Sequence, residues 1–297
     1  MTAAIRTRPF VKWAGGKSKI AAQVADMFAY RTCSRYFEPF IGGGAVFLEM
    51  ASRPASAVRT VEGAPYWAAL NDANAALIET YEVVRNDVRA LCGLLGGVTH
   101  TRELYERARK DVQVFGSGAV GRAARFIYLN KTCFNGLWRV NKKGDFNVPI
   151  GSYARPVLFE EENLLTWSRC LKGVTLWAED FEVVLGSAQS GDFVYSDPPY
   201  LPRSKTASFT SYTSGGFGPK DHERLVEALG RASARGALFV CSQRDSEFIR
   251  KLYNDFKLRV VDVQHSVASR GAGRSKVGEL LISNFTPRLG SSVEGCT

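Results

Sequence analysis

The clearest structural signal in the chain is the run Asp192-Phe193-Val194-Tyr195-Ser196-Asp197-Pro198-Pro199-Tyr200. Its first half is mainly apolar and rich in β-branched and aromatic residues, which is typical of a buried strand. That strand cannot continue past Asp197, because proline lacks a backbone N–H and has a fixed φ. The chain therefore turns at the carboxyl edge of a sheet, where open α/β proteins bind their ligands. A carboxylate, the Pro198 carbonyl and the Tyr200 ring suit a planar ligand with an exocyclic amine. The alternative is a proline-stopped strand with an incidental acid.

Other segments predict the rest of an α/β sheet. The segment 36–44 is predicted to be a strand that breaks into Gly42-Gly43-Gly44 and is followed by a helix at 45–51, and glycine at such a turn lets the backbone approach a ligand closely. A second strand ends at Asp72, an acid that either takes ribose hydroxyls or caps the next helix. Further strands are expected at 174–177, 237–241, 258–265 and 277–284, with helices at 19–28, 160–171, 220–234 and 245–254.

Between the second and third strands the pattern is helical. Apolar residues recur every three or four positions in three segments, 75–94, 102–114 and 119–131. The polar segment 130–153 follows, with turns at Gly136, Gly144 and Gly151. Its amides and guanidinium are side chains that read base edges in the major groove, and its lysines suit phosphates. A solvated β-hairpin loop is the alternative.

Composition restricts the class of protein. The 297 residues are 45% hydrophobic, which is ample for a core, and 39 Lys+Arg against 29 Asp+Glu give a net charge of +10 that favours a polyanionic partner. No run of about 18 apolar residues and no signal-peptide pattern is found. The six cysteines lack zinc-site spacing. We expect a soluble, cytoplasmic, metal-free protein.

The N-terminal segment includes Gly16-Lys17-Ser18, which looks like the end of a phosphate-binding P-loop. The first glycine of that motif would fall at Val11, so a nucleotide triphosphatase is not indicated. Trp13 and Lys17, on either side of a Gly-Gly turn, instead offer a stacking surface and a cation to a small ligand.

Together, five motifs in the same order resemble the Dam-type DNA adenine-N6 methyltransferases over about residues 9–285. They are Phe10-Val11-Lys12-Trp13-Ala14-Gly15-Gly16-Lys17, Glu38-Pro39-Phe40 with the glycine run, Asn135-Gly136-Leu137 through Arg139, Phe146-Asn147-Val148-Pro149, and Asp197-Pro198-Pro199-Tyr200.

The resemblance implies a Rossmann-like methyltransferase sheet with helices on both faces and an inserted, mainly helical DNA-recognition domain. Residues 1–72 and 166–286 would form the catalytic domain, 73–165 the recognition domain, and 287–297 a disordered tail. We expect a monomer that acts on double-stranded DNA, with GATC as the recognition site. The resemblance also raises roles in restriction-modification and DNA replication, and the sequence leaves open whether a partner nuclease exists.

The resemblance further implies the site residues. S-adenosylmethionine would contact Trp13, Ala14, Lys17, Glu38, Phe40, Gly42, Gly44, Asp72, Asp180, Phe181 and Asp197. Within that set Lys17 would lie near the cofactor carboxylate, Asp72 at the ribose, and Asp180 with Phe181 at the adenine ring. Asp197 and Pro198 would hold the amine of a flipped-out adenine, on which Tyr200 stacks. DNA would be read by Lys12, Phe134, Asn135, Leu137, Arg139, Pro149 and Tyr153. From its composition alone, the small, cationic link between the last two strands, which includes Arg270 and Arg274, suits phosphate contacts; an ordinary exposed hairpin is the alternative.

This chain departs from the family at three places: Phe134 replaces a common tyrosine, Ser152 stands where a basic residue can occur, and 53–68 is an apparent insertion. Other functions remain open at this point. The same tetrapeptide serves methylation of RNA adenine, cytosine N4 or protein glutamine, and a non-catalytic DNA-binding relative would keep the same fold.

Overall fold

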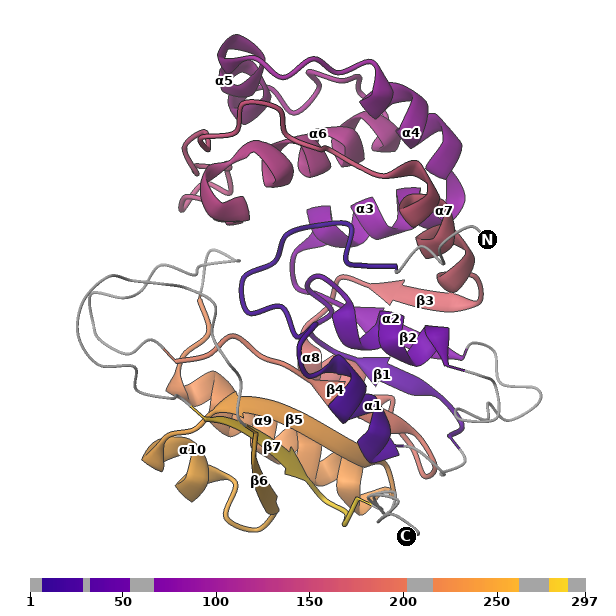
Figure 1. Cartoon of the computed structure of the whole chain (residues 1–297). Helices are drawn as coiled ribbons and strands as arrows, with labels where there is room; N and C mark the ends of the chain where they lie inside the picture. The colour runs from indigo at the N-terminus through magenta and orange to yellow at the C-terminus, as the bar shows by residue number, and fades with distance from the viewer. Residues whose placement is uncertain (1–6, 29–32, 54–66, 202–215, 262–277, 288–297) are drawn as a thin grey trace, which may run out of the picture.

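The computed structural model describes residues 7–28, 33–53, 67–201, 216–261 and 278–287. Its strands form one seven-stranded sheet in the order β3-β2-β1-β4-β5-β7-β6 (Figure 1). The strands are β1 (Tyr36–Glu38), β2 (Ala68–Asn71), β3 (Val174–Trp177), β4 (Phe193–Ser196), β5 (Leu238–Arg244), β6 (Lys257–Val261) and β7 (Glu279–Ser283).

The sheet is parallel from β3 to β5, and β7 is antiparallel to both β5 and β6. The chain builds β2 on one side of β1 and later places β4 on the other side. The gap between the carboxyl ends of β1 and β4 is therefore the topological switch point, the place at which such sheets bind ligands.

Helices cover both faces of the sheet. Successive strand residues point to opposite faces, so the apolar residues of each strand must be buried on both sides. Tyr36 packs with α1 and α2 in one core cluster, whereas its neighbour Phe37 packs with α8, α9 and α10 in the other. The covering helices are α1 (Ala21–Phe28), α2 (Ala45–Ser52), α8 (Phe181–Gly186), α9 (Pro219–Ala234) and α10 (Glu247–Leu252). The predicted α/β sheet with helices on both faces is confirmed.

A second group of helices lies beyond the β3 edge (Figure 1). α6 packs against α3, α4 and α5, while α7 packs against α2, α3 and α4 and so joins this group to the sheet. The group consists of α3 (Ala75–Asn86), α4 (Val88–Gly96), α5 (Arg102–Lys110), α6 (Ala119–Thr132) and α7 (Glu161–Cys170), with a short 3-10 turn η1 (Phe134–Gly136) after α6. No helix in the described parts of the chain has the length and apolarity to cross a bilayer.

Several predicted boundaries were wrong. The expected helix 75–94 is two helices, because the chain breaks at Asp87, whose φ of −129° and ψ of 30° are not helical. The expected helix 102–114 ends at Lys110, since the Asp111 carboxylate accepts the Gln113 N–H and starts a turn. The strand predicted to end at Cys241 continues through three polar residues to Arg244. α8 was not predicted. The last four residues of the expected strand 258–265 lie outside the described residues.

Candidate active site

A cavity of about 680 Å³ opens at the switch point. Four segments form most of its wall: the N-terminal Gly-Gly turn, the glycine run after β1, the end of β2, and the residues that follow β4. Residues 8–9, 216–217 and Arg244 of β5 also line it. It brings together most of the predicted cofactor residues and the predicted catalytic tetrapeptide 197–200. The predicted residues on its wall are Trp13, Ala14, Lys17, Glu38, Phe40, Gly42, Gly44, Asp72, Asp197, Pro198 and Tyr200.

The glycine run lies on the cavity wall and packs too closely against neighbouring rings to carry side chains. Gly42 has φ +47°, and a Cβ there would lie 2.5 Å from Cδ1 of Trp13. Gly44, with φ +69°, caps α2, and its Cβ would lie 2.7 Å from the Trp167 ring. Both residues adopt the left-handed region, which favours glycine. The run therefore leaves bare backbone on the cavity wall, where a ligand can approach closely.

Asp72 follows β2 and fixes this wall. Its Oδ2 accepts the Gly42 N–H at 3.1 Å and its Oδ1 accepts the Asn74 N–H at 2.9 Å. Burial raises the pKa of Asp72 to about 6, although both N–H donors act to lower it. The side chain that caps α3 is Asn74, which accepts the Leu77 N–H. Asp72 thus faces the cavity as a hydrogen-bond acceptor for hydroxyl groups.

Lys17 lies among carboxylates. Its Nζ is 2.9 Å from Asp197 Oδ1 and 3.5 Å from Glu279 Oε1, and only 8% of its side chain is exposed. Burial acts to lower the Lys17 pKa, but the two carboxylates outweigh it and the pKa is raised. Lys17 therefore carries a positive charge in the free protein and is paired with Asp197, the predicted catalytic carboxylate.

Asp197 is held from a second side. Its Oδ1 also accepts the Ser242 hydroxyl at 3.0 Å. Ser242 Oγ lies 2.8 Å from the Tyr195 hydroxyl, which must donate to it because the single Ser242 proton points to Asp197. Burial raises the pKa of Asp197, while Lys17 acts in the opposite direction. These contacts fix one carboxylate oxygen within the cavity.

Glu38, at the end of β1, is the second acid of the cavity. It is 2% exposed, and its Oε2 accepts the Tyr36 hydroxyl at 2.7 Å. Burial raises its pKa well above the usual range, and no described cation pairs with it. The Glu38 carboxyl is therefore a buried, hydrogen-bonded group on the cavity wall.

Sequence reasoning missed Ser242, Arg244 and Glu279, which belong to β5 and β7. Arg244 lies on the cavity wall, and Glu279 contacts both Lys17 and Tyr200. Polar residues in or next to otherwise apolar strands could have pointed to these three residues. Burying such groups is costly unless they are paired, so a buried polar residue indicates a specific partner.

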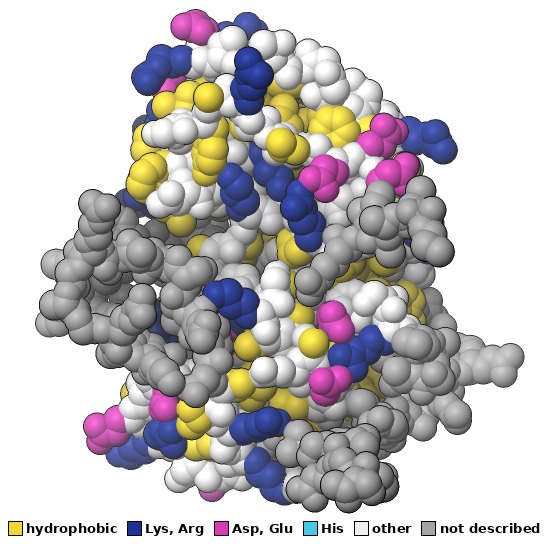
Figure 2. All heavy atoms as spheres, in the orientation of Figure 1, with side chains coloured by type: hydrophobic (Ala, Val, Ile, Leu, Met, Phe, Trp, Pro, Cys, Tyr) yellow, Lys and Arg dark blue, Asp and Glu magenta, His cyan; other side chains and the backbone are white. Residues whose placement is uncertain are grey.

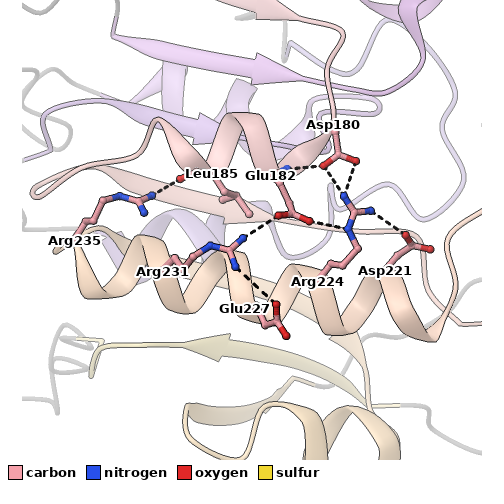
Figure 3. A network of polar contacts seen from close by, with 8 residues as sticks. All are labelled: Asp180, Glu182, Leu185, Asp221, Arg224, Glu227, Arg231 and Arg235. Carbon is pink, nitrogen blue, oxygen red and sulfur yellow. Dashed lines mark hydrogen bonds and ion pairs between the residues drawn. The ribbon is translucent and has the colours of Figure 1, made fainter.

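Asp180 and Phe181 lie apart from the large cavity. They line a neighbouring hollow of about 130 Å³ that shares Phe40 and Phe217 with it. Both Asp180 oxygens are 3.1 Å from Arg224 of α9, in a network of acids and arginines that links α8 to α9 (Figure 3). The Asp180 carboxylate also caps α8 by accepting the Glu182 N–H.

Lys12 joins the cofactor segment to the predicted DNA-reading segment. Its backbone exchanges two hydrogen bonds with the Asn130 side chain, each 2.7 Å long. Its Nζ donates to the Tyr153 hydroxyl at 3.0 Å and lies 4.1 Å from the centre of that ring. A Cβ at Gly136 would lie 2.4 Å from the Lys12 side chain. Lys12 and Tyr153 are therefore brought together at the base of the loop after α6.

The tip of that loop is exposed and conformationally unusual. Half of the Phe134 side chain is exposed, and its N–H donates to the Pro149 carbonyl. Asn135 has φ +54°, the one positive value among described non-glycine residues. The Leu137 carbonyl accepts the Cys133 thiol. Phe134 thus projects from a turn fixed at both ends.

Arg139 lies farther along the same loop. Its Nε donates to Asn147 Oδ1 at 2.7 Å, and the two residues are joined by a backbone hydrogen bond of 3.1 Å. Its guanidinium is therefore held from across the turn. Figure 2 shows Lys and Arg side chains along the middle of the face that it draws, where the helical group meets the sheet. Arg270 and Arg274 lie outside the described residues.

Comparison with known proteins gives the family. The model of the D12 class N6 adenine-specific DNA methyltransferases matches residues 13–267. The chain is 37% identical to the Type II methyltransferase M.MjaIII of Methanocaldococcus jannaschii, over 95% of this chain and 100% of that protein. It is 35% identical to the DNA adenine methylase of Vibrio cholerae over 96% and 99%, and 33% identical to that of Escherichia coli over 93% and 95%.

S-adenosylmethionine is the methyl donor in this class, and the cavity fits it: the left-handed glycines leave backbone exposed, and Asp72 offers an acceptor to hydroxyls. The enzyme methylates adenine N6 in DNA. Methylation of RNA, cytosine N4 or protein glutamine, and a purely DNA-binding role, are set aside. This chain belongs to the D12 class of N6 adenine-specific DNA methyltransferases.

Proposed function

We propose that the enzyme methylates the adenine of GATC sites in double-stranded DNA and turns that adenine out of the helix to do so. The observation that carries the proposal is the position of Asp197, whose carboxylate lies within the cavity beside the Tyr200 ring. An adenine amine inside a duplex is paired and stacked, so it reaches such a site only after extrusion, at a cost of a few kcal/mol.

The acceptor amine needs activation, because its lone pair is delocalised into the purine ring. The Asp197 carboxylate and the Pro198 carbonyl accept its two N–H groups and favour a tetrahedral nitrogen. Oδ1 of Asp197 already binds Lys17 and Ser242, which leaves Oδ2 for the amine. The fixed carboxylate then stabilises the positive charge that develops on N6. S-adenosylmethionine supplies an electrophilic methyl group.

Tyr200 offers the extruded base a surface to stack on. Base–aromatic stacking is worth about 1–3 kcal/mol, which offsets part of the cost of extrusion. Phe134, which is half exposed, is suited to enter the gap that the base leaves. Asn135 beside it would bind the orphaned partner base.

Residues 73–165 form the recognition domain in this proposal. Lys12, Leu137, Arg139, Pro149 and Tyr153 match positions that read GATC in the best-known members of the family. The contact between Lys12 and Tyr153 supports the proposal, because it couples the reading loop to the segment that lines the cofactor cavity.

The test is methyl transfer to three duplexes that contain GATC, a scrambled site, or a hemimethylated GATC. We expect transfer to both GATC duplexes and none to the scrambled one. Equal transfer to the scrambled duplex would refute the site preference but not adenine methylation.

The catalytic role of Asp197 is tested separately. Asp197→Ala should abolish transfer while DNA affinity stays within a few-fold of wild type, since the residue meets only the extruded base. Loss of DNA binding together with transfer would instead indicate a structural role.

A further inference from the structure

The catalytic tetrapeptide is held from the antiparallel side of the sheet. Glu279 is the first residue of β7 and is 7% exposed. Its Oε1 accepts the Tyr200 hydroxyl at 2.6 Å and lies 3.5 Å from Lys17 Nζ. Arg244, its register partner on β5, donates to the Leu201 carbonyl at 3.0 Å. Strands β5 and β7, side by side in Figure 1, therefore hydrogen-bond to Tyr200 and Leu201, the two residues that follow the prolines.

This arrangement fixes an aromatic ring that would otherwise rotate. A hydrogen bond to a charged acceptor is shorter and stronger than one between neutral groups. Burial raises the Tyr200 pKa well above its usual value, and the nearby Asp197 and Glu279 raise it further. The hydroxyl thus stays protonated and remains a donor. Lys17 Nζ lies 4.7 Å from the ring centre and the Arg244 guanidinium carbon 5.7 Å, so cations also contact the ring.

We propose that Glu279 is a positioning residue for methyl transfer, which holds the Tyr200 ring at the tilt needed for stacking and shares Lys17 with Asp197. The inference rests on the proposed role of Tyr200 as the stacking residue. Glu279 acts by two routes, through the hydroxyl of Tyr200 and through the charge of Lys17. Without the Glu279 carboxylate, Lys17 would pair with Asp197 alone. The Asp197 carboxylate would then attract the positive charge that develops on N6 more weakly.

The first experiment is a double-mutant cycle of Tyr200→Phe and E279A, in which the single-turnover rate of methyl transfer is measured. Unmethylated plasmid DNA is the substrate, because it carries many sites and the rate then does not depend on the exact recognition sequence. Enzyme and S-adenosylmethionine are saturating, so the rate reports the step after binding. We expect Tyr200→Phe to slow wild type about tenfold, the value of one hydrogen bond to a charged group. In an E279A background the same change should have no further effect.

A conservative variant separates the two routes. E279Q keeps a neutral acceptor for the hydroxyl but removes the charge that Lys17 shares, so its rate should fall between those of wild type and E279A. If Y200F slows E279A as much as it slows wild type, Glu279 does not act through Tyr200 and the proposal is wrong.

Asp192→Asn is the matched control for general destabilisation. Asp192 is a 1%-exposed carboxylate paired with Arg35 just before β4, whereas Asp197 follows that strand. D192N should lower the melting temperature and leave the single-turnover rate of the folded enzyme unchanged. An equal loss of rate in D192N and E279A would assign the effect to stability and overturn the proposal.

A third measurement separates this inference from the proposed extrusion. A GATC duplex with 2-aminopurine in place of the target adenine should brighten when wild type binds it. Absence of that rise would overturn extrusion and this inference with it. A rise in wild type, together with an unchanged Y200F effect in E279A, would overturn only the role of Glu279.

Discussion

The ammonium of Lys17 lies 2.9 Å from the carboxylate of Asp197, and both side chains are largely buried. The residue predicted to contact the cofactor therefore touches, in the free protein, the carboxylate predicted to hold the target amine. This ion pair would couple the predicted cofactor site to the predicted site for the target amine, so we expect a change at one site to alter binding or reaction at the other.

Lys17→Met should move the acid limb of the pH–rate profile to higher pH. Asp197 acts as a carboxylate, so transfer is lost as pH falls through its pKa. Burial raises that pKa and Lys17 lowers it. Removing Lys17 therefore raises the pKa of Asp197 further, because a close opposite charge no longer favours the ionised form. The measurement is the maximal transfer rate between acidic and neutral pH. Lys251→Met, an exposed change on α10, should leave the profile in place, and a shift to lower pH in K17M would contradict the assignment.

Asp72→Asn should weaken cofactor binding and flatten its pH dependence. An ionised carboxylate is a stronger acceptor for hydroxyl groups than an amide or a protonated acid. Because the pKa of Asp72 is about 6, affinity for S-adenosylhomocysteine in wild type should fall as pH drops through that value. Calorimetry of both proteins measures this. An equally steep fall in D72N would assign the titration to a different carboxyl group.

Gly42→Ala should displace the Trp13 ring and the glycine run that form part of the cavity wall. The new Cβ would lie 2.5 Å from the Trp13 ring, and φ +47° strains any side chain, at a cost of about 1–3 kcal/mol. We expect a lower melting temperature and at least tenfold weaker binding of S-adenosylhomocysteine. The matched control is Gly230→Ala within α9, where a Cβ meets nothing within 4 Å. It should stabilise the protein by about 0.5–1 kcal/mol and leave binding intact.

The sequence predicted the parallel half of the sheet well, because each of its strands is an apolar run that ends in a recognisable signal. β3 was predicted with its observed bounds, and β4 to within one residue. Parallel strands present their carboxyl ends at one edge, so knowing where Glu38, Asp72 and Asp197 stand in the sequence was enough to expect them together. The structure places all three on one cavity wall.

Other features depend on contacts that no local pattern encodes. The extension of β5 to Arg244 follows from its pairing with β7, and the carboxylate of Glu279 is buried because Tyr200 and Lys17 supply its partners. Asp180 matched a strand-tip acid in the sequence, but an arginine 44 positions later holds its carboxylate. Such pairings between distant segments can be read only from the folded chain.

Arg139→Ala should relax specificity at one base pair of the recognition site. Asn147 holds the Arg139 guanidinium through Nε at 2.7 Å and through one Nη2 N–H at 3.4 Å, which orients the group before DNA binds and leaves Nη1 and the other Nη2 N–H to reach a base edge. A bidentate contact of this kind discriminates by about 1–3 kcal/mol. The measurement is the transfer rate on GATC duplexes that each carry one substituted base pair.

Lys143→Met, in the exposed turn of the same loop, should lower the transfer rate on all duplexes alike, because a lysine contact to phosphate carries no sequence information. Asn147→Ala should relax the same base pair as R139A but less, since the guanidinium remains and loses only its orientation. A uniform loss across the series for R139A would make Arg139 a phosphate contact.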